Sequence, residues 1–116
     1  MSNARTTRIH RIRSSLAERI LVLDGATGTM VQDLLLGEDA YRGDRFTNHP
    51  TPLLGNHDLL SITRSEDMAA IHRAYLEAGA DFITTNTFNA QEISQSDYGM
   101  DAFVREINVA AAEIAR

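Results

Sequence analysis

Cysteine is absent from the 116 residues of this chain. A disulfide framework, a thiolate zinc site, an iron–sulfur cluster and a cysteine nucleophile therefore cannot form within it. Lysine is absent too, because all 11 basic side chains are arginine, and this removes a Schiff-base lysine and a P-loop lysine from consideration. No stretch reaches the roughly 18 consecutive apolar residues that a membrane span needs. The length predicts one small domain, or a piece of a larger one.

Charge is distributed unevenly along the chain. Residues 1–19 carry five arginines against Glu18, whereas residues 20–116 carry six arginines against fifteen acids. The acidic body argues against a nucleic-acid partner, which would need a basic face. The basic start lacks the apolar core of a secretory signal, so we expect a cytoplasmic protein without a membrane partner, with an organelle transit peptide as the alternative. The helical spacing of Ile9, Ile12 and Leu16 predicts that residues 1–19 form a basic helical extension before a domain at 20–116.

Beyond that extension the pattern alternates between strand-like and helical segments. Residues 20–23 and 80–85 are apolar or β-branched and predict two buried strands. Helices are predicted after residue 28, at 64–78, at 90–96 and at 101–116, with Thr63 and Glu66 as a capping box and Gly79 as a helix stop. Residues 37–60 read as a long loop. This order predicts an α/β fold with a parallel sheet, in which two strands are too few to be self-sufficient.

A glycine-rich turn after the first predicted strand is the first candidate site. Its glycines let backbone N–H groups approach an anion such as a carboxylate or phosphate, and an ordinary tight turn is the alternative. Asp24 is placed to hold an ammonium group, or else to cap the turn. The turn comprises Asp24, Gly25, Ala26, Thr27, Gly28 and Thr29.

Two other motifs carry polar chemistry. Residues 55–58 read Gly-Asn-His-Asp, as in metallophosphoesterases, but the sequence has no Asp-x-His, and Gly43-Asp44 is followed by Thr47 where a second aspartate is needed. Residues 84–88 read Thr-Thr-Asn-Thr-Phe after the second predicted strand. Their hydroxyl and amide groups suit a small polar substrate, and equally suit the capping of a strand end.

The order of these motifs resembles the start of the cobalamin-dependent methionine synthases, within the homocysteine S-methyltransferase family. The resemblance runs over about residues 16–116. It rests on the turn at 23–30, the segments Tyr-Arg-Gly-Asp-Arg-Phe at 41–46 and Gly-Asn-His-Asp-Leu-Leu at 55–60, the helix and strand at 69–81, Thr-Asn-Thr-Phe-Asn at 85–89, and Glu-Ile-Asn at 106–108 with three alanines at 110–112.

This resemblance implies that the chain forms the first βα units of a (β/α)8 TIM barrel, incomplete here. It implies that Asp24 helps to hold the amino group of homocysteine, that the backbone of residues 25–29 holds its carboxylate, and that Asn86 lies near the same pocket. Thr84 stands where many relatives have an acid.

The resemblance also implies two cofactors in a full-length enzyme. A zinc ion held by three cysteines binds the homocysteine sulfur, and cobalamin, recharged by methyltetrahydrofolate, supplies the methyl group. Because this chain has no cysteine, we expect no catalytic, metal or cofactor-binding residue in it and no activity from it alone. Its expected partners are homocysteine, the remaining barrel, and folate and cobalamin domains. The alternatives are a truncated barrel fragment that acts as a binding or assembly module and, less favoured, a metallophosphoesterase-like protein.

Overall fold

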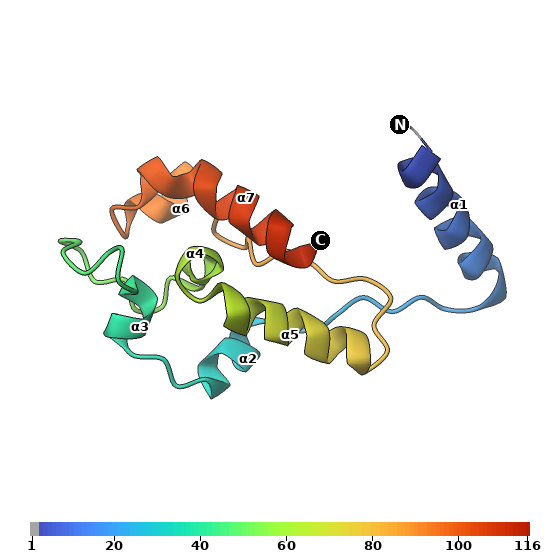
Figure 1. Cartoon of the computed structure of the whole chain (residues 1–116), viewed down its shortest axis with the longest axis horizontal. Helices are drawn as coiled ribbons and strands as arrows, with labels where there is room; N and C mark the ends of the chain where they lie inside the picture. Colours follow the sequence, from blue (N-terminus) through green and yellow to red (C-terminus); the bar gives the residue numbers. More distant parts are fainter. Residues whose placement is uncertain (1–2) are drawn as a thin grey trace.

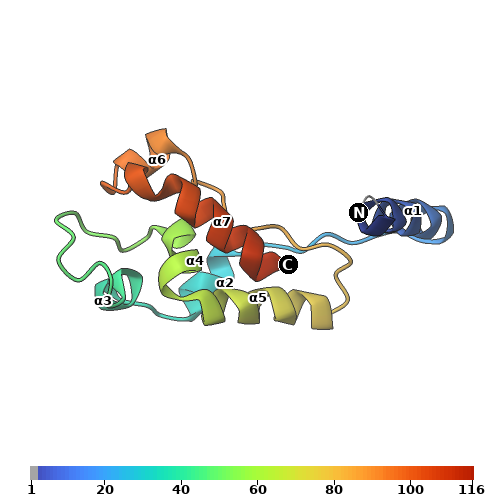
Figure 2. The same cartoon turned by 45° about the horizontal axis from the view of Figure 1, so that its top comes forward.

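A computed structural model of the chain describes residues 3–116. The described residues form helices: α1 (Asn3–Glu18), α2 (Gly28–Asp33), α3 (Glu38–Arg42), the 3-10 turn η1 (His57–Leu59), α4 (Leu60–Thr63), α5 (Ser65–Glu77), α6 (Glu92–Ser96), the 3-10 turn η2 (Asp101–Phe103) and α7 (Val104–Ala115). Helices α4, α5 and α7 pack together in the body of the molecule (Figure 1). Helix α1 stands apart from this body in both views and buries none of its residues (Figures 1 and 2).

The predicted fold class is wrong for the described residues, which contain no strand and no βα unit. Residues 20–23 and 80–85 do meet, but they form only one parallel bridge, between Leu23 and Phe82. Side chains replace the main-chain partners on either side of this bridge. The N–H of Val22 donates to the Asp81 carboxylate at 2.8 Å, and the N–H of Thr84 donates to the Asp24 carboxylate at 3.0 Å. A ladder that ends after one bridge is too short to form a sheet.

The periodic segments fold as helices where the pattern predicted them. In α7, the predicted apolar face buries Ile107 and Ala111. Gly79 follows α5 with a φ of 109° and confirms the predicted helix stop, because a left-handed residue at this position ends a helix with little strain. The capping box is wrong. Thr63 is the last residue of α4, and its hydroxyl donates to the carbonyl of Leu59 at 3.5 Å instead of capping α5.

The segment predicted as a long loop, residues 37–60, supplies much of the hydrophobic core. It contains α3 and η1 and buries apolar side chains between α2, α5 and α7. The core cluster consists of Val31, Tyr41, Phe46, Leu53, Leu59, Leu60, Met68, Ile71 and Met100. The apolar residues of this segment are too widely spaced to show a helical or strand period, so the sequence alone gave no sign of their burial.

None of the helices formed by residues 3–116 has both the length and the apolar character needed to cross a membrane.

The Asp81 carboxylate joins the end of α1 to the bridge region. It accepts hydrogen bonds from both terminal nitrogens of Arg19, at 2.6 and 3.0 Å, as well as from the Val22 N–H. The guanidinium and this N–H lower the pKa of Asp81 to about 2. Because the folded pKa lies below that of the unfolded chain, the stabilisation is complete above about pH 4 and is lost as the pH falls towards 2.

We therefore expect Asp81→Asn to lower the melting temperature near neutral pH and to lower it much less near pH 2, as measured by circular dichroism across a pH series. The control is Asp97→Asn, which changes an exposed carboxylate outside the described ion pairs. A loss of stability in Asp81→Asn that stayed constant across the series would contradict the assignment.

Candidate functional site

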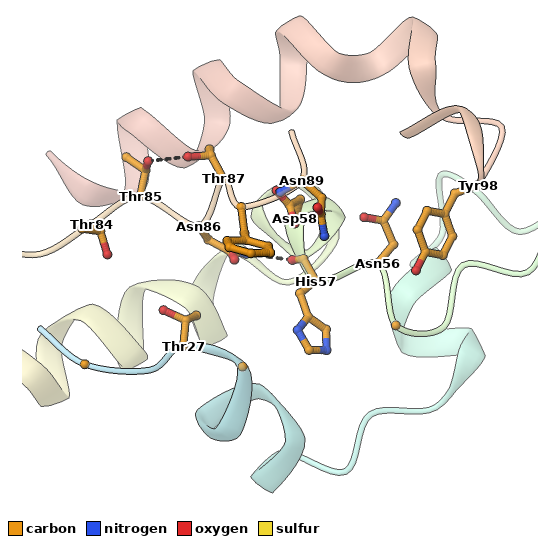
Figure 3. Close-up of a pocket in the computed structure, with 14 residues that line it drawn as sticks. Thr27, Asn56, His57, Asp58, Thr84, Thr85, Asn86, Thr87, Asn89 and Tyr98 are labelled. Carbon is orange, nitrogen blue, oxygen red and sulfur yellow. Dashed lines mark hydrogen bonds between the residues drawn. The ribbon is translucent and has the colours of Figure 1, made fainter. Parts of the chain in front are cut away.

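A pocket of about 640 Å³ opens where three loop segments converge (Figure 3). The first segment is the glycine turn before α2, the second is the Gly-Asn-His-Asp turn at η1, and the third follows the bridge residue Phe82. The volume lies within the range of pockets that bind small molecules. The pocket is lined by Gly25, Thr27, Gly28, Gly55, Asn56, His57, Asp58, Thr84, Thr85, Asn86, Thr87, Phe88, Asn89 and Tyr98.

Four of the predicted site residues line this pocket, namely Gly25, Thr27, Gly28 and Asn86. The other three, Asp24, Ala26 and Thr29, lie beside it in the same turn and do not line it.

The Asp24 side chain contacts the opposite segment. Its carboxylate accepts one hydrogen bond from the Thr84 hydroxyl at 3.0 Å and another from the Thr84 N–H at 3.0 Å. A glutamate or aspartate at position 84 would bring a second negative charge against Asp24, whereas threonine supplies a donor. Thr84 therefore fixes Asp24 at the rim of the pocket.

The glycine turn has backbone N–H groups without a backbone acceptor, and three of its residues, Gly25, Thr27 and Gly28, line the pocket. Within residues 3–116, none of the N–H groups from Gly25 to Met30 donates a backbone hydrogen bond outside a helix, and their positions leave them no acceptor within α2. Tyr75 of α5 holds the turn from behind, because its hydroxyl donates to the Ala26 carbonyl at 2.6 Å. A Cβ atom on Gly25 would lie 3.2 Å from that hydroxyl oxygen, so a side chain here would shift the Tyr75 hydroxyl or the turn by a few tenths of an ångström.

His57 projects into the pocket towards the glycine turn (Figure 3). Its ring stacks on Tyr41, with the ring centroids 6.2 Å apart. Its carbonyl accepts a hydrogen bond from the Asn86 side-chain amide at 2.7 Å. The same amide contacts the Met68 sulfur at 3.4 Å, and the Asn86 side chain is buried. Asn86 therefore connects the third segment to η1.

Buried polar groups support the other side of the pocket. Asn56 and Gln95 exchange two side-chain hydrogen bonds, at 2.8 and 3.0 Å, and Gln95 also donates to the Asn89 carbonyl at 3.0 Å. The Asp58 carboxylate accepts the Asn89 N–H at 2.7 Å. Burial raises the pKa of Asp58 above its usual range, although this N–H and the neighbouring His57 act in the opposite direction.

In the Gly-Asn-His-Asp turn, the Asn56 amide and the Asp58 carboxylate therefore already form hydrogen bonds with other parts of the protein. No three histidine or acidic side chains gather in a metal-ligand cluster within residues 3–116. The geometry gives no support to a two-metal phosphoesterase site.

Sequence reasoning missed three residues that shape the pocket. Tyr75 belongs to the apolar face of α5, and the spacing of apolar residues does not predict that its hydroxyl contacts the glycine turn. Gln95 and Tyr98 lie at and just after the end of α6, far from the other site segments in sequence. No local signal identifies them, because each acts through a contact across the fold.

One protein family matches most of the chain. The family model described as homocysteine S-methyltransferase matches residues 21–116, a range that includes every residue lining the pocket. The match covers well over half of the chain, and the chain therefore belongs to the homocysteine S-methyltransferase family, whose members transfer a methyl group to homocysteine.

Proposed function

We propose that the pocket binds homocysteine as a methyl acceptor and that this chain supplies part of the homocysteine site of a cobalamin-dependent methionine synthase. The observation that carries the proposal is the position of the glycine turn. Gly25, Thr27 and Gly28 of this turn line a pocket of amino-acid size, their N–H groups make no backbone hydrogen bond among the described residues, and the turn lies inside the segment that matches the family. Backbone N–H groups arranged in this way bind carboxylates.

The residues around the turn offer a partner for the substrate's ammonium group as well. Asp24 is held at the rim by two hydrogen bonds from Thr84. A carboxylate has about four acceptor sites, so Asp24 retains capacity for an ammonium group. The Oδ1 atom of Asn86 accepts no hydrogen bond within the described residues and is a further candidate acceptor. This division of roles is proposed from the family resemblance and these contacts.

The residues of this chain do not fit the zinc ion that the family resemblance implies. The sequence has no cysteine, and residues 3–116 contain no group of three possible ligands. We therefore assign no step within this chain to zinc. Methylcobalamin as the methyl donor, with methyltetrahydrofolate as its source, rests on the sequence motifs at 41–46, 55–60 and 106–112.

A binding or assembly module is the second candidate. Exposed apolar side chains favour it, because the bridge residue Leu23 is 57% exposed, Ile20 before it is 85% exposed, and Phe88 at the pocket is 92% exposed. Apolar groups of this size next to unpaired backbone promote association. Light scattering during size-exclusion chromatography tests this candidate, which a monomer at all concentrations would contradict.

Titration calorimetry of the purified chain with L-homocysteine, under reducing conditions, tests the main proposal. We expect saturable binding, whereas addition of methylcobalamin should give no methionine, because the chain cannot hold the zinc ion that activates the thiol. A chain with no affinity for homocysteine would contradict the substrate assignment. Stoichiometric zinc together with methionine formation would contradict the partial role.

Gly25→Ala should weaken homocysteine binding by about tenfold, because the new methyl group would displace either the Tyr75 hydroxyl or the turn that this hydroxyl holds. The matched control is Gly37→Ala. A Cβ atom on Gly37 meets no atom within 4 Å, so this substitution should leave binding unchanged. Calorimetry on both variants measures the difference, and equal affinities would show that the position of the turn does not matter for binding.

A further inference from the structure

His57 is the one basic side chain among the described residues that line the pocket, which include no arginine and no other histidine. Neither of its ring nitrogens makes a hydrogen bond within residues 3–116. A polar ring at a pocket wall with both nitrogens uncommitted can donate to a ligand.

One contact involves the ring of His57 and another its backbone. Tyr41 stacks on it with an interplanar angle of 29°, and the Asn86 amide holds the backbone carbonyl of the same residue. The next side chain, Asp58, makes no hydrogen bond to the ring, because its carboxylate accepts the Asn89 N–H instead. The imidazole therefore contacts Tyr41 while both of its ring nitrogens remain available to a ligand.

The ring faces the glycine turn. Its Nδ1 atom lies 4.0 Å from the point that a Cβ atom on Gly28 would occupy, so no side chain separates the ring from the turn at this point. His57 lines the same pocket as Gly25, Thr27 and Gly28, and its ring projects towards their turn (Figure 3). A carboxylate bound between the ring and the turn would accept hydrogen bonds from the imidazole on one side and from backbone N–H groups of the turn on the other.

We propose that His57 is a specificity-determining residue that donates a ring N–H to the α-carboxylate of the substrate, opposite the glycine turn. This inference rests on the proposed function and narrows the substrate class to thiol amino acids with a free carboxylate. It gives the histidine of the Gly-Asn-His-Asp turn a role in anion recognition in place of metal binding. A decarboxylated or esterified thiol lacks the group that this contact recognises.

The test combines a change in the protein with a change in the ligand. The ligands are L-homocysteine and 3-aminopropane-1-thiol, which is the same molecule without its carboxylate. The proteins are the full chain, His57→Phe, His57→Gln and the control His10→Gln. The phenyl ring keeps the stacking on Tyr41 but has no donor, glutamine keeps an N–H donor, and His10 is an exposed residue of α1.

We expect His57→Phe to weaken homocysteine binding by about tenfold and to change the affinity for 3-aminopropane-1-thiol by less than about twofold. His57→Gln should fall between the wild type and His57→Phe, and His10→Gln should bind as the wild type does. Circular dichroism checks that each variant keeps its helices. If the phenylalanine variant does not fold, His57→Leu, which also lacks a donor, carries the same comparison between the two ligands.

The outcomes separate this inference from the proposed function. Equal losses for both ligands would show that His57 acts only through the shape of the pocket, and no loss for either would remove it from recognition. Both results overturn the inference while leaving homocysteine as the substrate. If the wild type binds neither ligand, the proposed function fails, and the inference that rests on it fails as well.

Discussion

Replacement of Gln95 by alanine is expected to destabilise the folded chain by about 3 kcal/mol, through lost hydrogen bonds and a cavity. The side chain is fully buried and joins Asn56 to the Asn89 carbonyl through three hydrogen bonds. Its removal leaves the amide of Asn56, which is only 2% exposed, without its partner. An unsatisfied polar group that stays buried costs more than the hydrogen bond itself contributed. Urea denaturation followed by circular dichroism measures the loss.

The matched control for this variant is Gln91→Ala at the start of α6. Gln91 is exposed, and its side chain donates only to the Ser94 hydroxyl, at 3.1 Å. Its replacement should cost less than about 0.5 kcal/mol. Equal losses for the two variants would show that the buried amide pair contributes nothing specific. Because Asn89 lines the pocket, Gln95→Ala should also weaken homocysteine binding under conditions in which the variant remains folded.

Replacement of Arg42 by alanine is expected to cost a similar amount, about 3 kcal/mol. The guanidinium pairs with Glu38 at 2.8 Å and donates to the carbonyls of Phe46, Thr47, His49 and Thr51. Only arginine has enough N–H donors in one plane to reach Glu38 and these four carbonyls together, so Arg42→Lys should recover little of the stability that Arg42→Ala loses. The variant should release the loop that carries Phe46 into the core, as measured by urea denaturation and amide hydrogen exchange.

Glu38 strengthens this network from the other side. Burial opposes its ionisation, but the N–H groups of Leu53 and Leu54, together with Arg42, hold the pKa of its carboxyl below its usual range. The ion pair of Glu38 and Arg42 therefore holds residues 46–54 through hydrogen bonds to their backbone, from Arg42 at one end and from Glu38 at the other. Loss of Arg42 leaves Glu38 with only its backbone donors.

The control for Arg42 is Arg64→Ala. Arg64 pairs with Asp67 at the same distance of 2.8 Å and at similar helical spacing, but its side chain is 43% exposed, compared with 17% for Arg42. An exposed ion pair of this kind contributes less than about 1 kcal/mol. A cost for Arg64→Ala as large as that for Arg42→Ala would contradict the view that burial and the carbonyl contacts make the difference.

The helices of this chain were largely predictable from the sequence, whereas the two strands predicted from it do not form among the described residues. Helical periodicity is a local property, and it located α5 and α7 together with the glycine that ends α5. A strand needs a partner along its length, which no local pattern specifies. Residues 20–23 and 80–85 have strand-like composition, yet Asp24 and Asp81 take the neighbouring N–H groups, and the pairing ends after one bridge.

The site shows the same division. The sequence by itself determined the family and identified the glycine turn and Asn86, because these motifs are contiguous and carry their chemistry in the residue types. Only the tertiary structure decided that Asp24 turns to Thr84, that Tyr75 holds the turn, and that His57 faces it across the pocket. Each of these depends on where two distant segments come to lie. That placement is set by the packing of the core and by the satisfaction of buried polar groups over the whole chain.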